Sequence, residues 1–194
     1  MESKQNWADE ALITAIARKD HDAFRVLIER YQGKVLGSIY RYVGNRNIAE
    51  DLAQDIFIKV YKSAGRYQPK AKFSTWLFKL VVNHCINYQR HLKKDPFGKL
   101  KYIEEPLGDS DYITASVLEN KDPETILSQK ERITFLRKAI NSLPERQKMA
   151  VILQRFEGLS YAEIGEIMGC SVKAVESLLQ RAMVTLKESL TPYV

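Results

Sequence analysis

Cysteine and long hydrophobic runs are both scarce in this sequence. Only two cysteines occur in 194 residues, Cys85 and Cys170, and their wide separation excludes a disulfide framework and a paired CxxC metal site. We expect both to be ordinary buried thiols. No run of about 18 apolar residues is present, and residues 1–12 lack the apolar stretch and cleavage site of an export signal. We therefore expect a cytoplasmic protein.

Histidine is scarce as well, which argues against metal-dependent catalysis. The three histidines, His21, His84 and His91, do not form a spaced metal set. Asp51 and Asp55 are one helical turn apart, but no third ligand accompanies them. We expect no catalytic residue, no metal and no cofactor, so an enzyme that cleaves nucleic acid is the disfavoured alternative.

The distribution of charge is more informative than the net charge of +6. Residues 1–103 hold 19 Lys and Arg against 10 Asp and Glu, and residues 125–194 hold 10 against 7. Residues 104–124 hold one Lys against seven acids. Two basic bodies joined by an acidic strap indicate a polyanionic partner such as nucleic acid.

Apolar residues recur at helical spacing along most of the chain, and alternating strand patterns are absent. The predicted helices cover residues 8–18, 21–43, 48–64, 74–92, 126–141, 144–156, 161–168 and 172–189. The fold class is therefore all-α. We expect two small helical domains, 1–95 and 125–194, joined by a flexible acidic linker at 96–124 that is rich in proline and contains at most a short helix at 113–118.

Several predicted helix ends carry capping signals. Asn47 precedes Glu50 and Ser160 precedes Glu163 at capping-box spacing. Two glycines are placed where helices should stop, Gly65 and Gly169.

Residues 159–187 have the pattern of a helix-turn-helix, in which the first turns of the second helix enter the major groove. The outward residues near its start are the predicted contacts to duplex DNA: Ser171, Lys173, Ala174, Glu176, Ser177, Gln180 and Arg181. Four apolar residues should instead pack within the domain: Val172, Val175, Leu178 and Leu179. An ordinary helical hairpin is the alternative to the DNA-binding motif.

The polar residues of this second helix differ in what they can recognise. Arg181 and Lys173 can donate to guanine or phosphate, and Gln180 can form paired bonds with adenine. Glu176 can accept only from a cytosine amine and weakens nonspecific binding. Whether Glu176 reads a base or is a solvated residue stays open.

Basic and aromatic residues are interleaved between Lys59 and Tyr102, with eleven Lys and Arg, eight aromatic residues and one acid, Asp95. Cations neutralise phosphates while rings stack on unpaired bases, so the mixture predicts capture of a melted strand. The predicted contacts are Arg66, Tyr67, Gln68, Lys70, Lys72, Phe73, Ser74, Thr75, Trp76, Lys79, Asn83, Asn87 and Arg90. Core packing is the alternative for Trp76, and a solvated face is the alternative for the stripe from Lys79 to Arg90.

An acidic face precedes this basic region. Asp51, Gln54, Asp55 and Ile58 recur at helical spacing next to Phe57, which looks exposed. Simple solvation explains the face, and so does a docking surface for a basic, partly apolar helix of a partner. Composition does not decide between the two.

Four ordered segments resemble the extracytoplasmic-function (group 4) sigma factors of the sigma-70 family. AFRVLIERYQGKVLGSIYRYVGN, AEDLAQDIFIKVYKSAGRYQ and FSTWLFKLVVNHCINYQR resemble sigma region 2. INSLPERQKMAVILQRFEGLSYAEIGEIMGCSVKAVESLLQRA resembles region 4. The resemblance spans nearly the whole chain and implies a non-catalytic subunit that directs core RNA polymerase to promoters.

The resemblance also implies roles for the surfaces described above. Its polymerase-binding segment corresponds to Asp51, Leu52, Gln54, Asp55, Phe57 and Ile58, which would dock on the coiled coil of the largest subunit. Region 2 would capture the melted minus-10 element through loop 66–73 and the helix after it. Region 4 would read the minus-35 duplex through residues 172–181 and contact the flap of the second-largest subunit, and the acidic strap would run toward the RNA exit path.

Regulation would come from outside the chain. The resemblance implies an anti-sigma factor, membrane-anchored or soluble, that covers the polymerase-binding faces in a stress or signal response, because no sensory domain is added before the end at Val194. A stable homo-oligomer is not expected. Many relatives carry a basic residue, Ser and Arg where this chain has Glu176, Ser177 and Leu178, so promoter preference cannot be transferred. A free-standing dimeric repressor or activator is the rival, but it leaves the acidic face and the basic aromatic region unexplained.

Overall fold

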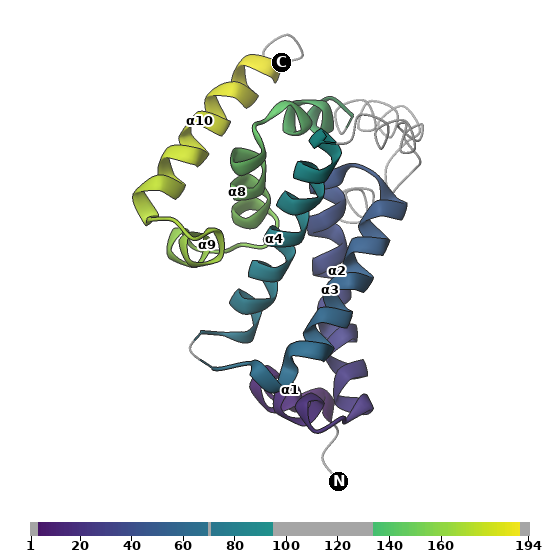
Figure 1. The fold of residues 1–194 in the computed structure, drawn as a ribbon. Coiled ribbons are helices and arrows are strands. Elements are labelled where there is room, and N and C mark those ends of the chain that lie inside the picture. The colour runs from purple at the N-terminus through teal and green to yellow at the C-terminus, as the bar shows by residue number, and fades with distance from the viewer. Residues whose placement is uncertain (1–3, 70, 95–133, 191–194) are drawn as a thin grey trace, which may run out of the picture.

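The computed structural model describes residues 4–69, 71–94 and 134–190. Within these ranges the regular elements are helices and there is no strand, which confirms the all-α prediction (Figure 1). The predicted linker at 96–124, the short helix at 113–118 and Lys70 lie outside the described residues.

The N-terminal half is a bundle built on three long helices. α2 (His21–Val43), α3 (Arg46–Ser63) and α4 (Phe73–Lys94) lie side by side, and α1 (Asp9–Ala17) packs across one end of α2 (Figure 1). A 3-10 turn, η1 (Lys4–Asn6), precedes α1. The apolar face that each helix turns inward forms the core, with Leu27, Val35, Ile56, Leu77 and Cys85 fully buried.

The turn between α2 and α3 is set by local capping. α2 ends at Val43 and is followed by Gly44, whose φ of 79° is left-handed and suits glycine. Asn45 then caps α3 by accepting from the Ile48 amide at 3.0 Å. The predicted capping box of Asn47 and Glu50 is therefore wrong, because α3 begins earlier and Glu50 pairs with Arg46 at 2.9 Å.

The other end of α3 leads into the loop before α4. α3 ends at Ser63, and η2 (Ala64–Arg66) follows it as one 3-10 turn. Gly65 therefore lies inside that turn and is not the residue at which the helix stops.

The C-terminal half is a smaller helical unit. Residues 134–142 are helical and are followed by α8 (Glu145–Arg155), α9 (Tyr161–Met168) and α10 (Val172–Leu190). α10 packs against both α8 and α9 (Figure 1). The inward faces bury Ile152, Ile164, Val175 and Leu179.

The two halves pack against each other. α8 contacts α2, and α9 contacts α4 (Figure 1). The buried apolar residues of both halves belong to one continuous cluster. The sequence alone left this placement open, since a flexible linker is compatible with open and closed arrangements.

Candidate nucleic-acid and partner interfaces

The helix-turn-helix is formed by α9, a tight turn and α10. Ser160 accepts from the Glu163 amide at 3.3 Å, and the Glu163 carboxylate accepts from the Ser160 amide at 3.0 Å. This capping box confirms the predicted start of α9. Gly169 ends the helix with a φ of 62°, as its sequence position predicted.

A second glycine, Gly165, makes the turn compact, and the sequence analysis missed it. A Cβ atom at Gly165 would lie 2.8 Å from the carbonyl oxygen of Cys170. The Cys170 amide donates to the Gly165 carbonyl at 2.9 Å, so the chain after α9 folds back onto the helix. A glycine inside a short capped helix is the signal that could have indicated this close approach.

The expectation that both cysteines are buried is confirmed for Cys85 and wrong for Cys170, which is half-buried.

The recognition helix α10 exposes most of its predicted DNA contacts. Five of these residues have exposed side chains: Ser171, Lys173, Glu176, Gln180 and Arg181. The other two, Ala174 and Ser177, are half-buried. Ser171 caps the helix by accepting from the Ala174 amide at 3.2 Å. The exposed set lies along the first half of the helix, on the side away from the domain core.

One packing prediction for this helix is wrong. Val175 and Leu179 are buried and Leu178 packs against the core. Val172 is 50% exposed, because it lies one turn before the exposed Glu176 on the side of α10 that is turned away from the core.

The loop before α4 is closed by an aromatic cluster. The Tyr67 hydroxyl donates to the Ala71 carbonyl at 3.1 Å, which bridges the loop. The rings of Tyr67, Phe73 and Trp76 lie 5.3–6.0 Å apart in tilted and edge-on arrangements. Arg66, Gln68 and Lys72 are exposed around this cluster.

The predicted DNA contacts in this loop and in the first turn of α4 differ in how deeply they are buried. Phe73 is 1% exposed and Thr75 is 6% exposed, so in this structure both are packing residues rather than surface contacts. Trp76 and Ser74 are half-buried. Trp76 therefore packs against the core and still offers part of its ring to solvent.

Helix α1 positions the loop, a contribution that no sequence signal indicated. The Glu10 carboxylate accepts from the Phe73 amide, at the start of α4, at 3.4 Å. Tyr31 stacks edge-on against Phe73 at 5.4 Å and donates to Asp9. Burial, together with the Asp9 carboxylate, raises the pKa of Tyr31 and keeps the hydroxyl protonated as a donor.

A polar stripe continues from the loop along α4. Lys79, Asn83, Asn87 and Arg90 are all exposed and recur every three or four residues. Together with Arg66, Gln68 and Lys72 they form a surface of cations and amides that suits a nucleic-acid backbone.

The acidic face on α3 is exposed as predicted, with one correction. Asp51, Gln54 and Asp55 are on the surface, and Ile58 is 49% exposed. Leu52 is half-buried. Phe57 is only 8% exposed, so the interpretation that it is an exposed residue is wrong; it packs in the core beneath the face.

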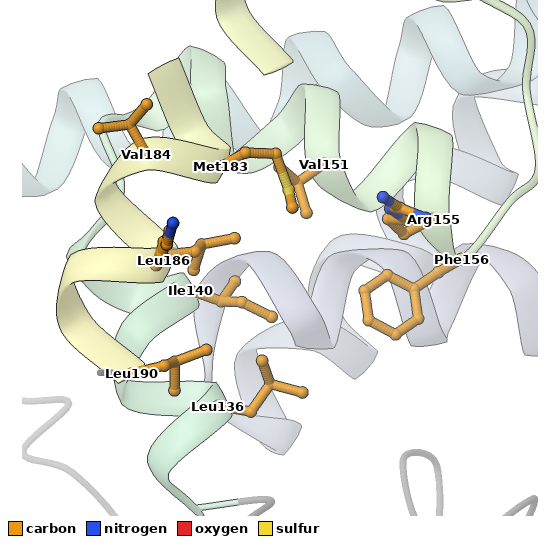
Figure 2. A pocket seen from close by; sticks show the side chains of 10 residues that line it. Leu136, Ile140, Val151, Arg155, Phe156, Met183, Val184, Leu186 and Leu190 are labelled. Carbon is orange, nitrogen blue, oxygen red and sulfur yellow. The ribbon is translucent and has the colours of Figure 1, made fainter. Parts of the chain in front are cut away.

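An apolar groove lies between α8 and α10. It has a volume of about 590 Å³, and Figure 2 shows its side chains converging from α8, α10 and the helical segment 134–142. Its lining is Leu136, Ile140, Val151, Arg155, Phe156, Met183, Val184, Leu186, Lys187 and Leu190. Val184 and Met183 are 58% and 49% exposed, so the groove presents apolar side chains to solvent.

Within the described residues, no group of three or more His, Cys, Asp or Glu side chains is placed to hold a metal ion. None of the helices in the same ranges is both long and apolar enough to cross a membrane.

Comparisons with known proteins identify the family to which this chain belongs. The model described as Sigma-70 region 2 matches residues 27–94, and the model described as Sigma-70, region 4 matches residues 136–186. The chain is 36% identical over 187 residues to the ECF RNA polymerase sigma-E factor of Haemophilus influenzae, covering 95% of this chain and 96% of that protein. It is 32% identical over 187 residues to the ECF RNA polymerase sigma-E factor of Escherichia coli K12, covering 96% of each.

Two solved structures share the fold. CnrH in complex with the cytosolic domain of CnrY matches with a TM-score of 0.67 and 22% identity, over 97% of this chain and all of that chain. The sigma factor RpoE in complex with the anti-sigma factor NepR, from Bartonella quintana, matches with a TM-score of 0.66 and 21% identity, over 88% of this chain and 98% of that one.

Proposed function

Because the chain belongs to the extracytoplasmic-function group of the sigma-70 family and is an alternative sigma factor, we propose that separate exposed surfaces bind core polymerase and the two promoter elements. Region 2, residues 1–95, binds core polymerase and the minus-10 element. Region 4, residues 125–194, reads the minus-35 element, and residues 96–124 link the two. The observation that carries this division is the exposure of three chemically distinct faces on separate helices: acidic on α3, cationic on α4 and polar on the start of α10.

The acidic face is the docking site for the coiled coil of the largest polymerase subunit. Asp51, Gln54 and Asp55 supply acceptors for basic side chains, and Ile58 supplies exposed apolar area beside them. Phe57 and the half-buried Leu52 support the face from below.

The loop 66–72 and α4 take up the melted minus-10 strand. Arg66, Gln68, Lys72, Lys79, Asn83, Asn87 and Arg90 contact its backbone and bases, and Lys70 belongs to the same loop. Tyr67, Ser74 and Trp76 are half-buried and offer part of their surface to the strand, while the buried Phe73 and Thr75 hold the start of α4 in place.

Region 4 inserts the start of α10 into the duplex major groove. Lys173 and Arg181 meet phosphates or guanine, Gln180 meets adenine, and Ser171, Ala174, Glu176 and Ser177 complete the contact surface. The apolar groove between α8 and α10 receives the flap of the second-largest polymerase subunit, and its half-exposed Met183 and Val184 support that assignment.

An anti-sigma factor controls access to these surfaces. The Bartonella quintana RpoE that shares this fold was solved with its anti-sigma factor NepR. We assign to such a partner the acidic face and the apolar groove, because covering both blocks polymerase. The protein acts in the cytoplasm, or at the inner face of the membrane where the anti-sigma factor is anchored there, and it uses no cofactor and forms no stable homo-oligomer.

Abortive transcription tests the proposal. Purified core polymerase and the full chain are incubated with a promoter library, and the intact protein is compared with Asp51→Arg and Gln54→Ala. We expect promoter-dependent product that falls about tenfold or more with Asp51→Arg, the loss typical of a charge reversal at an interface. Glu29→Arg, an equal charge change at an exposed residue of α2, is the control and should leave the product unchanged. Absence of product, together with tight duplex binding by the protein alone, would instead identify a free-standing repressor.

A further inference from the structure

A second group of cations lies close to the minus-10 loop, where the turn between α1 and α2 meets the end of α3. Arg18 and Lys19 are exposed in this turn, and Lys62 is exposed in the last turn of α3. The Lys19 ammonium lies 5.0 Å from the centre of the Tyr61 ring, so the turn and the end of α3 are in contact. We call Arg18, Lys19, Tyr61 and Lys62 the turn patch. None of the four is among the DNA or polymerase contacts assigned above.

The acids beside the turn patch are paired with other cations. Asp20 pairs with Lys4 at 2.6 Å, and Asp22 pairs with Arg25 at 3.0 Å. Within residues 4–69, 71–94 and 134–190, none of the three cations of the patch pairs with a carboxylate. The patch therefore keeps its positive charge for a partner outside the chain.

Lys19 has a backbone conformation that favours glycine. α1 ends at Ala17, and Lys19 is the one residue other than glycine with a positive φ, 68°, in the part of the chain that the structure describes. Glycine or asparagine is the usual choice at such a helix end, because a Cβ atom is strained there. A lysine in this conformation, held over a ring, points to a role for its charge. The charge also suits the C-terminus of α1, so a purely structural role is the alternative.

η2 connects the turn patch to the minus-10 loop. α1 contacts η2, and Arg66 in η2 is four residues after Lys62 (Figure 1). Residues 59–69 contain no Asp or Glu. From Tyr61 to Arg66 the chain rises by about 9 Å, at roughly 1.5 Å per residue in α3 and 2.0 Å in η2. A strand with a phosphate about every 3.4 Å covers this distance with about three nucleotides.

A strand held at the minus-10 loop has two ends, and the stripe on α4 accounts for one of them. This stripe, from Lys79 to Arg90, leads away from the loop along α4, whereas the turn patch lies at the same end of the bundle as the loop, beyond η2 (Figure 1). An acidic protein surface would also suit the cations. The acid-free connection to the loop favours nucleic acid instead, because cations next to aromatic rings suit a single strand.

We propose that the turn patch is a second strand-binding site, which holds the single-stranded DNA next to the stretch bound by the minus-10 loop. Arg18, Lys19 and Lys62 contact its phosphates, irrespective of base, and the Tyr61 ring keeps Lys19 in position. This inference rests on the proposed function for the identity of the loop. It adds a site to which neither the polymerase face nor the helix-turn-helix contributes.

The salt dependence of strand binding tests the site. The full-length chain is titrated into an end-labelled oligothymidylate of about 16 nucleotides, and affinity is measured by fluorescence anisotropy from about 50 to about 200 mM salt. For single strands, each phosphate contact contributes about 0.7 to the slope of log affinity against log salt. We therefore expect Lys62→Gln and Lys19→Asn each to reduce the slope by about 0.7, and the double variant by about 1.4.

Two controls accompany these variants. Lys34→Gln removes an exposed lysine of α2, about 20 Å along the helix from the turn at roughly 1.5 Å per residue, and should leave the slope unchanged. The intact chain should bind one strand, because the loop and the patch share it. Two strands bound per chain would show separate sites and overturn the shared path.

Variants of Lys19 separate its charge from its backbone. Lys19→Arg should keep the slope of the intact chain. Lys19→Gly relieves the strain, so it should move the midpoint of urea denaturation upward and still bind the strand several-fold more weakly at low salt. A Lys19→Gly protein that binds the strand as tightly as the intact chain would show that the lysine is only structural.

The remaining outcomes distinguish this site from the proposed function. Slopes for Lys62→Gln and Lys19→Asn that match Lys34→Gln would overturn the site, and so would an intact chain that does not bind the strand at low salt. Unchanged slopes together with weaker binding of core polymerase, measured without DNA, would assign the patch to an acidic polymerase surface. Failure of the proposed function shows instead as no promoter-dependent transcription by the intact chain, whatever the slopes.

Discussion

The ammonium group of Lys148 lies 5.4 Å from the centre of the Tyr42 ring, across the boundary between the two halves of the chain. Lys148 also donates to the side chain of Asn141 at 2.6 Å. The hydroxyl of Tyr42 is buried without a hydrogen-bond partner, and Cys85 is close enough to interact electrostatically with the lysine. A cation is therefore held in a largely apolar site by one hydrogen bond and one ring face.

Replacing this cation by an apolar side chain of similar length should stabilise the protein. Lys148→Met removes the cost of dehydrating the ammonium, and the exposed Asn141 can bond to water instead. We expect the free energy of unfolding at pH 7 to rise by about 1–3 kcal/mol, measured by urea denaturation. Lys138→Met, a change at a solvent-facing residue, is the control. A loss of stability in Lys148→Met would show that the cation-ring contact outweighs the dehydration.

Stability should also depend on pH through the same residue. The pKa of Lys148 is about 8 in the folded chain and 10.5 when exposed, so the unfolded chain binds more protons between these values and stability rises with pH there. Cys85 acts oppositely, because burial raises its pKa to about 12 from 9.0 and stability falls as pH rises through 9. In a Cys85→Ala background, denaturation between pH 7.5 and pH 10 should show a rise that Lys148→Met abolishes. The same rise in both proteins would assign it to another group.

Secondary structure could be predicted from the sequence because local signals determine it. The period of apolar residues located α2, α8, α9 and α10 to within about two residues, and Ser160 with Gly169 fixed both ends of α9. Asn45 and Asn47 are both candidate caps of α3, and the spacing of Asn47 from Glu50 favoured the wrong one, because Asn45 is the cap.

Tertiary relationships could not be predicted, because they join residues far apart in the chain. Nothing in the spacing of Phe57 or Val172 indicated that the first is buried and the second exposed. The support that Glu10 gives to the start of α4 joins residues 63 positions apart. The contact of Lys72 with Glu163 depends on how two halves dock, which residue patterns do not encode.

The turn of the helix-turn-helix gives a sharp test of packing. Gly165→Ala places a methyl group 2.8 Å from the Cys170 carbonyl, so backbone must shift, and we expect a loss of about 1–3 kcal/mol in the free energy of unfolding. Gly33→Ala is the matched control, because its Cβ meets nothing within 4 Å on an exposed position of α2. Alanine should raise stability there by about 0.5–1 kcal/mol. Urea denaturation of both variants measures the contrast, and equal stabilisation would refute the close approach.

Exposed apolar area on the acidic face should contribute to polymerase affinity without contributing to folding. Ile58→Ala removes a side chain that is 49% exposed, so unfolding should change by less than about 0.5 kcal/mol. Burial of that side chain against polymerase corresponds to about 1–2 kcal/mol, or roughly a 5- to 30-fold loss of affinity for the core enzyme. Val172→Ala, at a 50% exposed residue of α10, is the control in binding assays without DNA. Equal losses for both variants would place the polymerase contact elsewhere.

Glu176 is an acid among the predicted DNA contacts, and it either accepts a hydrogen bond from a cytosine amine or is only solvated. Neutralising its charge distinguishes these two roles. Glu176→Gln removes repulsion from phosphates, so affinity for random duplex DNA should rise by about threefold at low salt and converge with the intact protein as salt is added. Glu188→Gln makes the same change on an exposed residue near the other end of α10 and should have little effect. A promoter duplex tells the roles apart. If Glu176 is only solvated, promoter affinity rises in parallel with random DNA. If it accepts from a cytosine amine, promoter affinity falls while random binding rises, and a base substitution at that pair in the duplex abolishes the difference between the two proteins.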